Sequence, residues 1–115
     1  MRSTAPGVTN EAVYTDTTMA LYADTGRLAW YYQHQANDQL DHDWAFERTL
    51  LDLPVDGATK KVVITGGKAA IFDAMDARTG AYLFSIDLDM QNVIQGIDPK
   101  TGAKTLNPKA VPAPD

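Results

Sequence analysis

The chain has 115 residues, room for one modest domain or for part of a larger one. Its formal net charge is −5, so the basic face of a nucleic-acid binder is not expected, and we expect no nucleic-acid partner. No cysteine is present, which excludes disulfides and thiolate metal sites, and no apolar run reaches the length of a membrane span. Residues 1–17 lack the apolar centre of a secretory signal peptide, so an exported protein would need a signal that this sequence does not carry.

Short β-rich runs separated by turn residues predict an all-β chain that folds as an antiparallel meander. The expected strands, in chain order, are 12–15, 18–23, 27–34, 48–54, 60–66, 69–76 and 81–88. In the third of these, Leu28, Trp30 and Tyr32 share one face, and Trp30 is expected to pack between neighbouring units. Residues 43–48 have an alternative reading as one helical turn with Asp43 as the N-cap.

The turns between the expected strands carry a repeat. Residues 20–30 (ALYADTGRLAW) and 74–84 (AMDARTGAYLF) both follow Ala-x-x-Ala-x-Thr-Gly-x-x-x-aromatic, and 97–105 (IDPKTGAKT) is a looser copy. A polar residue is expected to cap each turn, and glycine to take a positive φ. The first two copies are 54 residues apart, roughly the length of one propeller blade. Two ordinary hairpins with a common turn solution are the alternative.

The predicted strands make a little more than one blade, which would leave unpaired sheet edges. Propeller blades bury their faces against their neighbours, so an isolated pair should be marginal. We therefore interpret 1–115 as a partial propeller of about one to two blades, a fragment of a larger domain rather than a free-standing small β domain. Residues 106–115 are rich in proline and are predicted to form an exit linker.

Asp41 and Asp43 stand two residues apart in the stretch 39–47 (QLDHDWAFE). Like charges this close need water, a cation or a proton between them. If the segment is extended, both carboxylates point to one side while His42 faces away. Carboxylate oxygens suit Ca²⁺ and similarly hard ions, but two carboxylates are too few, so further ligands must come from elsewhere. The spacing alone favours a solvated acidic loop or a helix N-cap.

The residues resemble a known family. The stretch ALYADTGRLAW is similar to the tryptophan-docking repeat of the quinoprotein alcohol dehydrogenases, eight-bladed β-propellers that depend on pyrroloquinoline quinone (PQQ). Residues 28–57 resemble that family's passage from a docking tryptophan through a Trp-Asp-Tyr-Asp-like motif to an outer strand, and 62–88 resemble the following blade. The resemblance begins near Val13 and implies an internal fragment of the propeller. Leu40 and His42 depart from the motif, where Trp and Tyr are usual.

The resemblance also implies a site. In this family PQQ lies over a metal ion, Ca²⁺ or a lanthanide, on the propeller axis. Asp41 maps to the general base that takes the alcohol proton and to a metal ligand, Asp43 to the additional ligand of the lanthanide type, and Lys68 to the residue that holds the quinone oxygens. The implied partners are an alcohol and a periplasmic electron acceptor such as a cytochrome c. The full-length protein would act in the periplasm, whereas the fragment alone is expected to be inactive.

The alternative is a non-catalytic PQQ-like propeller that serves as a binding or assembly scaffold. Such a scaffold has no reason to keep Asp-x-Asp followed by Gly-Lys one blade later, which favours the enzyme. Lys68 by itself also fits an ordinary surface lysine, because the surrounding residues lack the phosphate-loop pattern. His34 and His42 have no partner spacing and are not expected to bind a metal.

Overall fold

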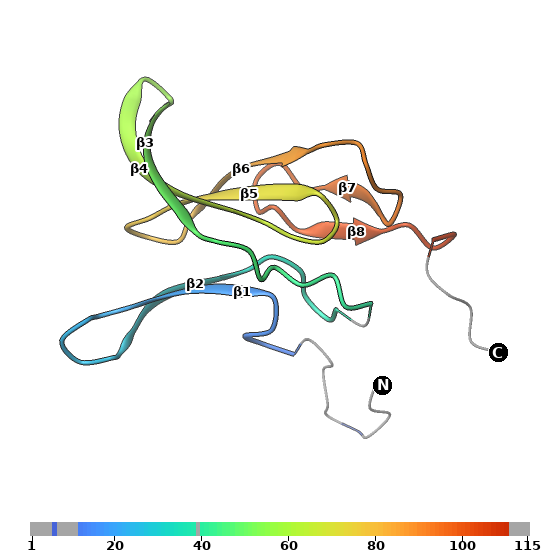
Figure 1. Ribbon diagram of the computed structural model, residues 1–115, viewed down its shortest axis with the longest axis horizontal. Helices are drawn as coiled ribbons and strands as arrows, with labels where there is room; N and C mark the ends of the chain where they lie inside the picture. The colour runs from blue at the N-terminus through green and yellow to red at the C-terminus, as the bar shows by residue number, and fades with distance from the viewer. Residues whose placement is uncertain (1–5, 7–11, 39, 111–115) are drawn as a thin grey trace.

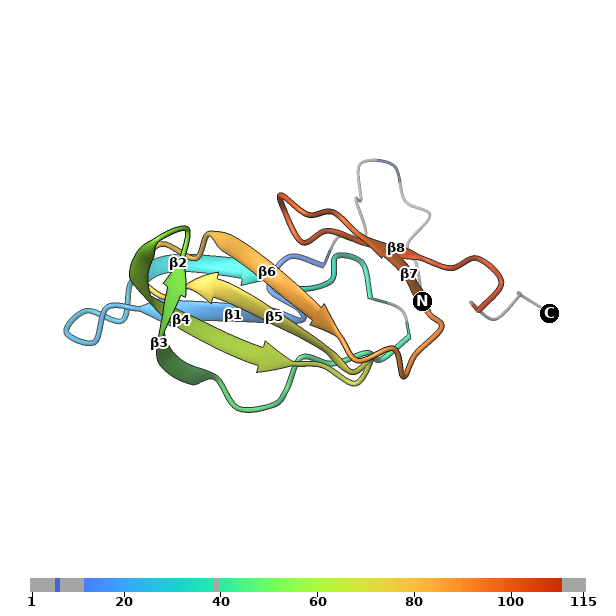
Figure 2. The same ribbon diagram turned by 90° about the horizontal axis from the view of Figure 1, so that it is seen from above.

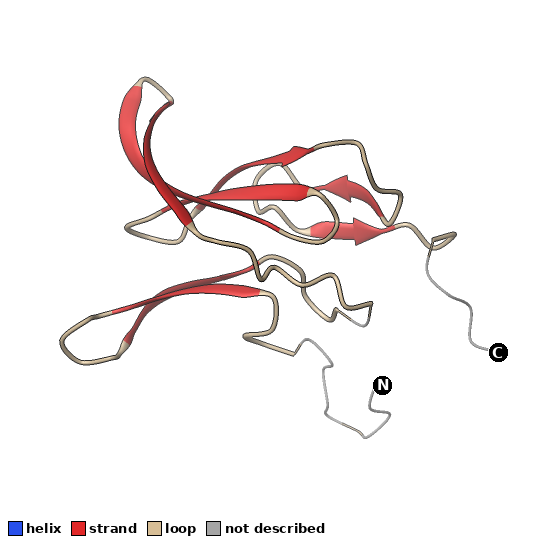
Figure 3. Cartoon of the chain, viewed as in Figure 1, coloured by secondary structure: helices blue, strands red, loops and turns tan. Residues whose placement is uncertain are grey.

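The computed structural model describes residues 6, 12–38 and 40–110, which form eight strands and no helix (Figures 1 and 3). Among these residues, then, no helix is available to span a membrane. The all-β, antiparallel prediction is confirmed. The strands are β1 (Thr17–Leu21), β2 (Leu28–Gln33), β3 (Thr49–Val55), β4 (Ala58–Gly66), β5 (Ile71–Asp76), β6 (Tyr82–Asp87), β7 (Ile94–Ile97) and β8 (Lys104–Leu106).

The strands form three separate antiparallel sheets, each a simple meander in chain order: β1–β2, β3–β4–β5–β6 and β7–β8. The β1–β2 hairpin lies against one side of the four-stranded sheet, as Figures 1 and 2 both show. The four-stranded sheet has the number of strands expected of one complete blade, and a two-stranded sheet precedes and follows it in the chain.

Three local predictions were wrong or incomplete. Residues 12–15 form a turn instead of a strand, because Ala12 and Tyr14 have φ values of 50° and 76° and Thr15 bonds back to the Ala12 carbonyl. Residues 43–48 form no helical turn. β7 and β8, which flank the third turn copy, were not anticipated as strands. The expected linker begins within β8, at Leu106, continues as a turn over 108–110, and otherwise lies outside the described residues.

The Thr-Gly repeat has a common backbone geometry. The glycine of each copy has a φ between 69° and 75° and donates its N–H to the carbonyl oxygen four residues earlier, at 2.7 to 2.8 Å: Gly26, Gly80 and Gly102. Left-handed backbone of this kind favours glycine, as predicted. In the second and third copies, the carboxylates of Asp76 and Asp98 accept hydrogen bonds from turn amides.

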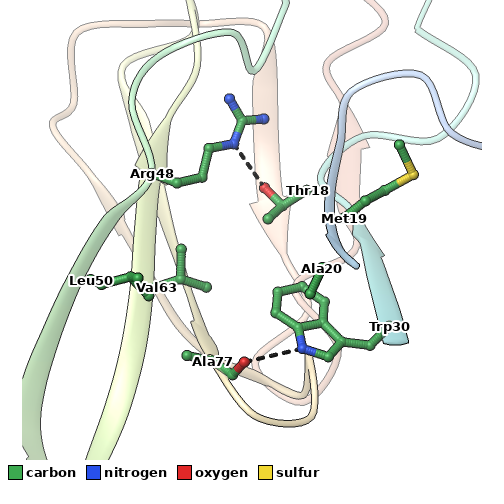
Figure 4. A pocket seen from close by; sticks show the side chains of 8 residues that line it. All are labelled: Thr18, Met19, Ala20, Trp30, Arg48, Leu50, Val63 and Ala77. Atoms are coloured by element: carbon green, nitrogen blue, oxygen red, sulfur yellow. Dashed lines mark hydrogen bonds between the residues drawn. The ribbon is translucent and has the colours of Figure 1, made fainter. Parts of the chain in front are cut away.

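Trp30 joins the first hairpin to the four-stranded sheet. Its indole Nε1 donates to the Ala77 carbonyl at 3.1 Å (Figure 4). A Cβ built on Gly80 would lie 2.6 Å from the ring. The predicted packing role of Trp30 is confirmed. Beside this contact lies a mostly apolar cavity of about 240 Å³ between the two sheets, lined by Thr18, Met19, Ala20, Trp30, Arg48, Leu50, Val63 and Ala77.

A buried carboxylate connects all three sheets. Asp73 on β5 accepts a hydrogen bond from His34 Nδ1, just after β2, and another from Lys104 Nζ on β8, both at 2.7 Å. Ser85 Oγ on β6 donates to its second oxygen at 2.6 Å. The side chains of Asp73, His34 and Lys104 are all completely buried. Burial alone would raise the pKa of Asp73, but these three donors outweigh it and hold the pKa below its ordinary value.

The hydrogen bonds around His34 fix its tautomer. The ionised Asp73 carboxylate can only accept, so His34 Nδ1 carries the proton. In the neutral ring, the Thr18 hydroxyl, which accepts from Arg48 Nε at 3.3 Å, then donates to His34 Nε2 at 2.9 Å. Burial, together with the positive charges of Lys104 and Arg48, lowers the pKa of His34 and outweighs the opposing effect of Asp73, so the ring is neutral.

The docking contact predicts unequal effects of two alanine substitutions. Gly26→Ala and Gly80→Ala both place a side chain at a left-handed φ, which costs about 1 kcal/mol. Only the Gly80 variant also forces a Cβ into the Trp30 ring, because the space at Gly26 is open within 4 Å. We expect Gly80→Ala to lower the free energy of unfolding by about 1–3 kcal/mol more than Gly26→Ala, measured by urea denaturation. Equal losses would show that the Trp30 contact is not tight.

His34 predicts a pH dependence of stability. Its pKa is lowered in the folded chain, so below the ordinary value of 6.5 the unfolded chain binds a proton that the folded chain resists. This contribution to stability is present above that pH and is lost as the pH falls through the folded pKa. We expect the free energy of unfolding of the native chain to fall between about pH 7.5 and 5.5 relative to that of His34→Gln.

The comparison with His34→Gln isolates the histidine because other groups titrate in the same range. Burial and the neighbouring Asp38 raise the pKa of Asp16 to about 6, which gives a pH dependence of opposite sign in both chains. If the difference between the two chains does not change with pH, His34 is not held neutral.

Candidate functional site

The loop between β2 and β3 carries the Asp-x-Asp pair and is held by its own polar groups. The two carboxylate oxygens of Asp38 accept hydrogen bonds from the backbone N–H of Leu40 at 2.8 Å and of His42 at 2.7 Å. The buried ring of His42 pairs through Nδ1 with Gln35 Oε1 at 2.9 Å. Asp41, between two anchored amides, is thereby held at the surface.

The structure brings the three predicted site residues together. Lys68 Nζ lies 2.9 Å from Asp41 Oδ2 and 2.7 Å from Asp43 Oδ2, although 27 and 25 residues separate it from them in the sequence. The backbone N–H of Lys68 also donates to the carbonyls of His42 and Asp43, at 2.9 and 3.1 Å. Side chain and backbone of Lys68 thus both bind the Asp-x-Asp loop.

The expected backbone of this segment was wrong. Residues 41–45 are not extended, since Asp41 and Asp43 have φ values of 62° and 30°. Aspartate tolerates left-handed backbone better than most residues because its short side chain bonds to nearby backbone groups. The two carboxylates therefore reach one point through two left-handed residues, whereas the prediction relied on the alternation of a strand.

The cluster is open to water and carries a net negative charge. The side chains of Asp41, Asp43 and Lys68 are 81%, 43% and 49% exposed. The hydrogen bond and charge of Lys68 lower the pKa of Asp41, and the two carboxylates raise the pKa of Lys68 above its ordinary value. Solvent weakens these effects at such exposure. Asp41 is therefore ionised at neutral pH and faces a charged ammonium.

The donor set suits a hard cation only in part. Carboxylate oxygens are the ligands that Ca²⁺ and similar ions prefer, and such ions take six or more oxygens. Within the described ranges, no group of three or more His, Cys, Asp or Glu side chains is placed to hold a metal ion. Asp41 and Asp43 could therefore supply only two of the side-chain ligands that such an ion takes. Lys68 now occupies the position between them.

Sequence reasoning missed the residues that support the loop. Arg48 donates to the backbone carbonyls of Trp44 and Phe46, both at 2.7 Å. The Trp44 side chain is 2% exposed and packs with Ala69, Ile71 and Ile94 in the core between the sheets. Trp44 had no assigned role, and no motif in the sequence points to it or to Arg48.

Comparison with known proteins identifies the family. The profile of the PQQ glucose/ethanol/alcohol dehydrogenase β-propeller domain matches residues 7–106. The chain belongs to this family. The family assigned from the Thr-Gly repeat and the Asp-x-Asp stretch is therefore confirmed, and so is the propeller architecture.

Similar proteins share the sequence and the fold over most of the chain. The lupanine 17-hydroxylase [cytochrome c] of a Pseudomonas species is 35% identical over 98 residues, 85% of this chain and 14% of that protein. The structure of a quinohemoprotein alcohol dehydrogenase from Pseudomonas putida matches with a TM-score of 0.80 and 30% identity, over 86% of this chain and 14% of its own. The structure of a europium-containing methanol dehydrogenase matches with a TM-score of 0.78 and 25% identity, over 84% of this chain and 17% of its own. This quinoprotein chain thus spans about one seventh of the length of its curated relatives.

Proposed function

We propose that this chain is part of a PQQ-dependent dehydrogenase that oxidises an alcohol, and that Asp41, Asp43 and Lys68 are its contribution to the active site. The observation that supports this most directly is the convergence of both carboxylates on one lysine from the next blade. An ordinary surface loop does not require it. The family membership and the alcohol dehydrogenases among the similar structures support the reaction class.

The residues fit the groups that this reaction needs. Asp41 and Asp43 would hold Ca²⁺ or a lanthanide ion together with ligands from outside the chain. Two carboxylates in place of one increase the negative charge of the site and favour a trivalent ion, and the similar europium-containing enzyme supports that choice. Lys68 would hold the quinone oxygens, where its positive charge stabilises negative charge that develops on them. When bound, PQQ would be the oxidant that accepts the hydride of the alcohol.

Asp41 has the protonation state that a general base requires. Because Lys68 lowers its pKa, its carboxylate is free to accept the hydroxyl proton of an alcohol at neutral pH. The same ion pair makes it a weak base. If the ammonium of Lys68 turns toward the quinone oxygens, its part in lowering the pKa of Asp41 is lost.

The remaining parts of the proposal concern the whole protein. It would act in the periplasm and pass electrons to an acceptor such as a cytochrome c, as the name of the similar lupanine 17-hydroxylase suggests. The chain alone, as a piece of that propeller, would be inactive.

Substitution of the base tests the reaction. In the whole protein loaded with PQQ and Ca²⁺ or La³⁺, Asp41→Ala is expected to lower kcat about 10²–10⁴-fold, the usual contribution of a general base. The measurement is alcohol-dependent reduction of a dye. Asp52→Ala, at an exposed ion pair on β3, is the control and should keep its turnover. Unchanged turnover in Asp41→Ala would exclude Asp41 as the general base. No turnover in the native protein would favour the non-catalytic scaffold propeller.

Metal binding is tested on the isolated chain with Tb³⁺, whose luminescence Trp44 can sensitise from its place next to Asp43. We expect Asp43→Asn to weaken binding about tenfold, because a hard cation loses one of two charged ligands. Lys68→Met should strengthen it, because the ammonium no longer competes for the carboxylates. Asp52→Asn is the control, and equal affinities in all four chains would contradict the metal site.

A further inference from the structure

The two segments that carry the site pack against each other through residues adjacent to the site residues. Trp44 directly follows Asp43, and Gly67 directly precedes Lys68. A Cβ built on Gly67 would lie 2.6, 2.7 and 2.9 Å from the indole atoms Cδ2, Cε2 and Cε3 of Trp44. Such distances are well below van der Waals contact, so an indole at position 44 requires a glycine at position 67.

This packing continues into the charged cluster. One residue beyond it, the Lys68 N–H bonds to the carbonyls of His42 and Asp43. The side chain of the same residue reaches the carboxylates, because Lys68 Nζ bonds to Asp41 and Asp43. The distance between the two segments therefore sets whether one ammonium can reach both carboxylates.

Trp44 is itself fixed from the other parts of the fold. The His34 ring stacks parallel to the indole, with ring centroids 5.3 Å apart and planes within 1°. The Lys104 ammonium lies 4.9 Å from the centre of the indole ring, and Arg48 donates to the Trp44 carbonyl. Because the indole is held on these sides, a change at Gly67 must displace the segment that carries Lys68.

We propose that Trp44 and Gly67 form a positioning pair, in which close packing of the indole on the glycine sets the separation between the Asp41–Asp43 pair and the ammonium of Lys68. Neither residue supplies a group to the cluster, and both act through their neighbours. The consequence for catalysis rests on the proposed function. The effect on Lys68 does not require a metal or a quinone.

The pair is tested with Gly67→Ala in the isolated chain, with Gly96→Ala as the matched control. Neither glycine has a left-handed φ, and the space at Gly96 on β7 is open within 4 Å. The readout is the exchange of the Lys68 Nζ protons with water, measured by NMR on chain labelled with ¹⁵N-lysine. We expect exchange to be about threefold faster in Gly67→Ala, as for loss of an exposed ion pair, and unchanged in Gly96→Ala.

A second variant separates positioning from core packing. Trp44→Phe alone removes the tight contact and is expected to speed the exchange of the Lys68 ammonium. In the double variant Gly67→Ala with Trp44→Phe, the smaller ring leaves room for the Cβ, so exchange should return toward the native rate. A residue that only fills the core would change the free energy of unfolding without this reciprocal rescue.

Each outcome decides the proposal. Exchange in a folded Gly67→Ala chain that equals the Gly96→Ala control overturns it. If Gly67→Ala does not fold, native exchange in Trp44→Phe overturns it, and faster exchange supports it. Turnover of the whole protein separates the two proposals: if the chain shows the reciprocal rescue but the whole protein, loaded with PQQ and metal, has no alcohol-dependent turnover, the proposed function is lost and the positioning pair stands.

Discussion

The arrangement of this chain depends on the buried carboxylate of Asp73. It sits in the four-stranded sheet and takes donors from the segment after β2 and from β8, so one ionised group joins all three sheets. Burial of a charge is costly unless its hydrogen bonds are complete, and loss of one partner leaves the remainder uncompensated. The complete set of donors favours a single arrangement of the sheets, and it places the His34 ring where Trp44 stacks on it.

From that network the order extends to the surface through packing and backbone hydrogen bonds. The described residues of the loop that carries the acid pair, 34–38 and 40–48, have no helix or strand, yet most of them are held by hydrogen bonds. Asp38 binds its amides, Arg48 binds its later carbonyls, and the Lys68 backbone binds those between. A loop fixed by a rigid scaffold in this way exposes charged groups and keeps their positions fixed, as binding sites require.

The family explains why two kinds of turn occur side by side. The Thr-Gly turns repeat one backbone geometry, and the glycines of the second and third copies, Gly80 and Gly102, pack against aromatic side chains, which is a structural task. The loop after β2 differs from them in length and charge, and it carries the acid pair. Fold and proposed chemistry thus belong to different connections, and the function must be argued from the second kind.

The sequence by itself determined the alternation of strands, the left-handed glycines of the Thr-Gly turns, the docking of Trp30 and the family. These follow from local patterns, in which a residue type and its spacing fix the backbone within a few positions. It also indicated Asp41, Asp43 and Lys68 as candidates. It gave the wrong backbone for 41–45 and no role for His34, Trp44 or Gly67. Only the tertiary structure decided these, because their partners lie far away in the chain: 39 residues separate His34 from Asp73, and 31 separate Asp73 from Lys104. Contacts over such separations are set by how the sheets pack, and no local spacing encodes them.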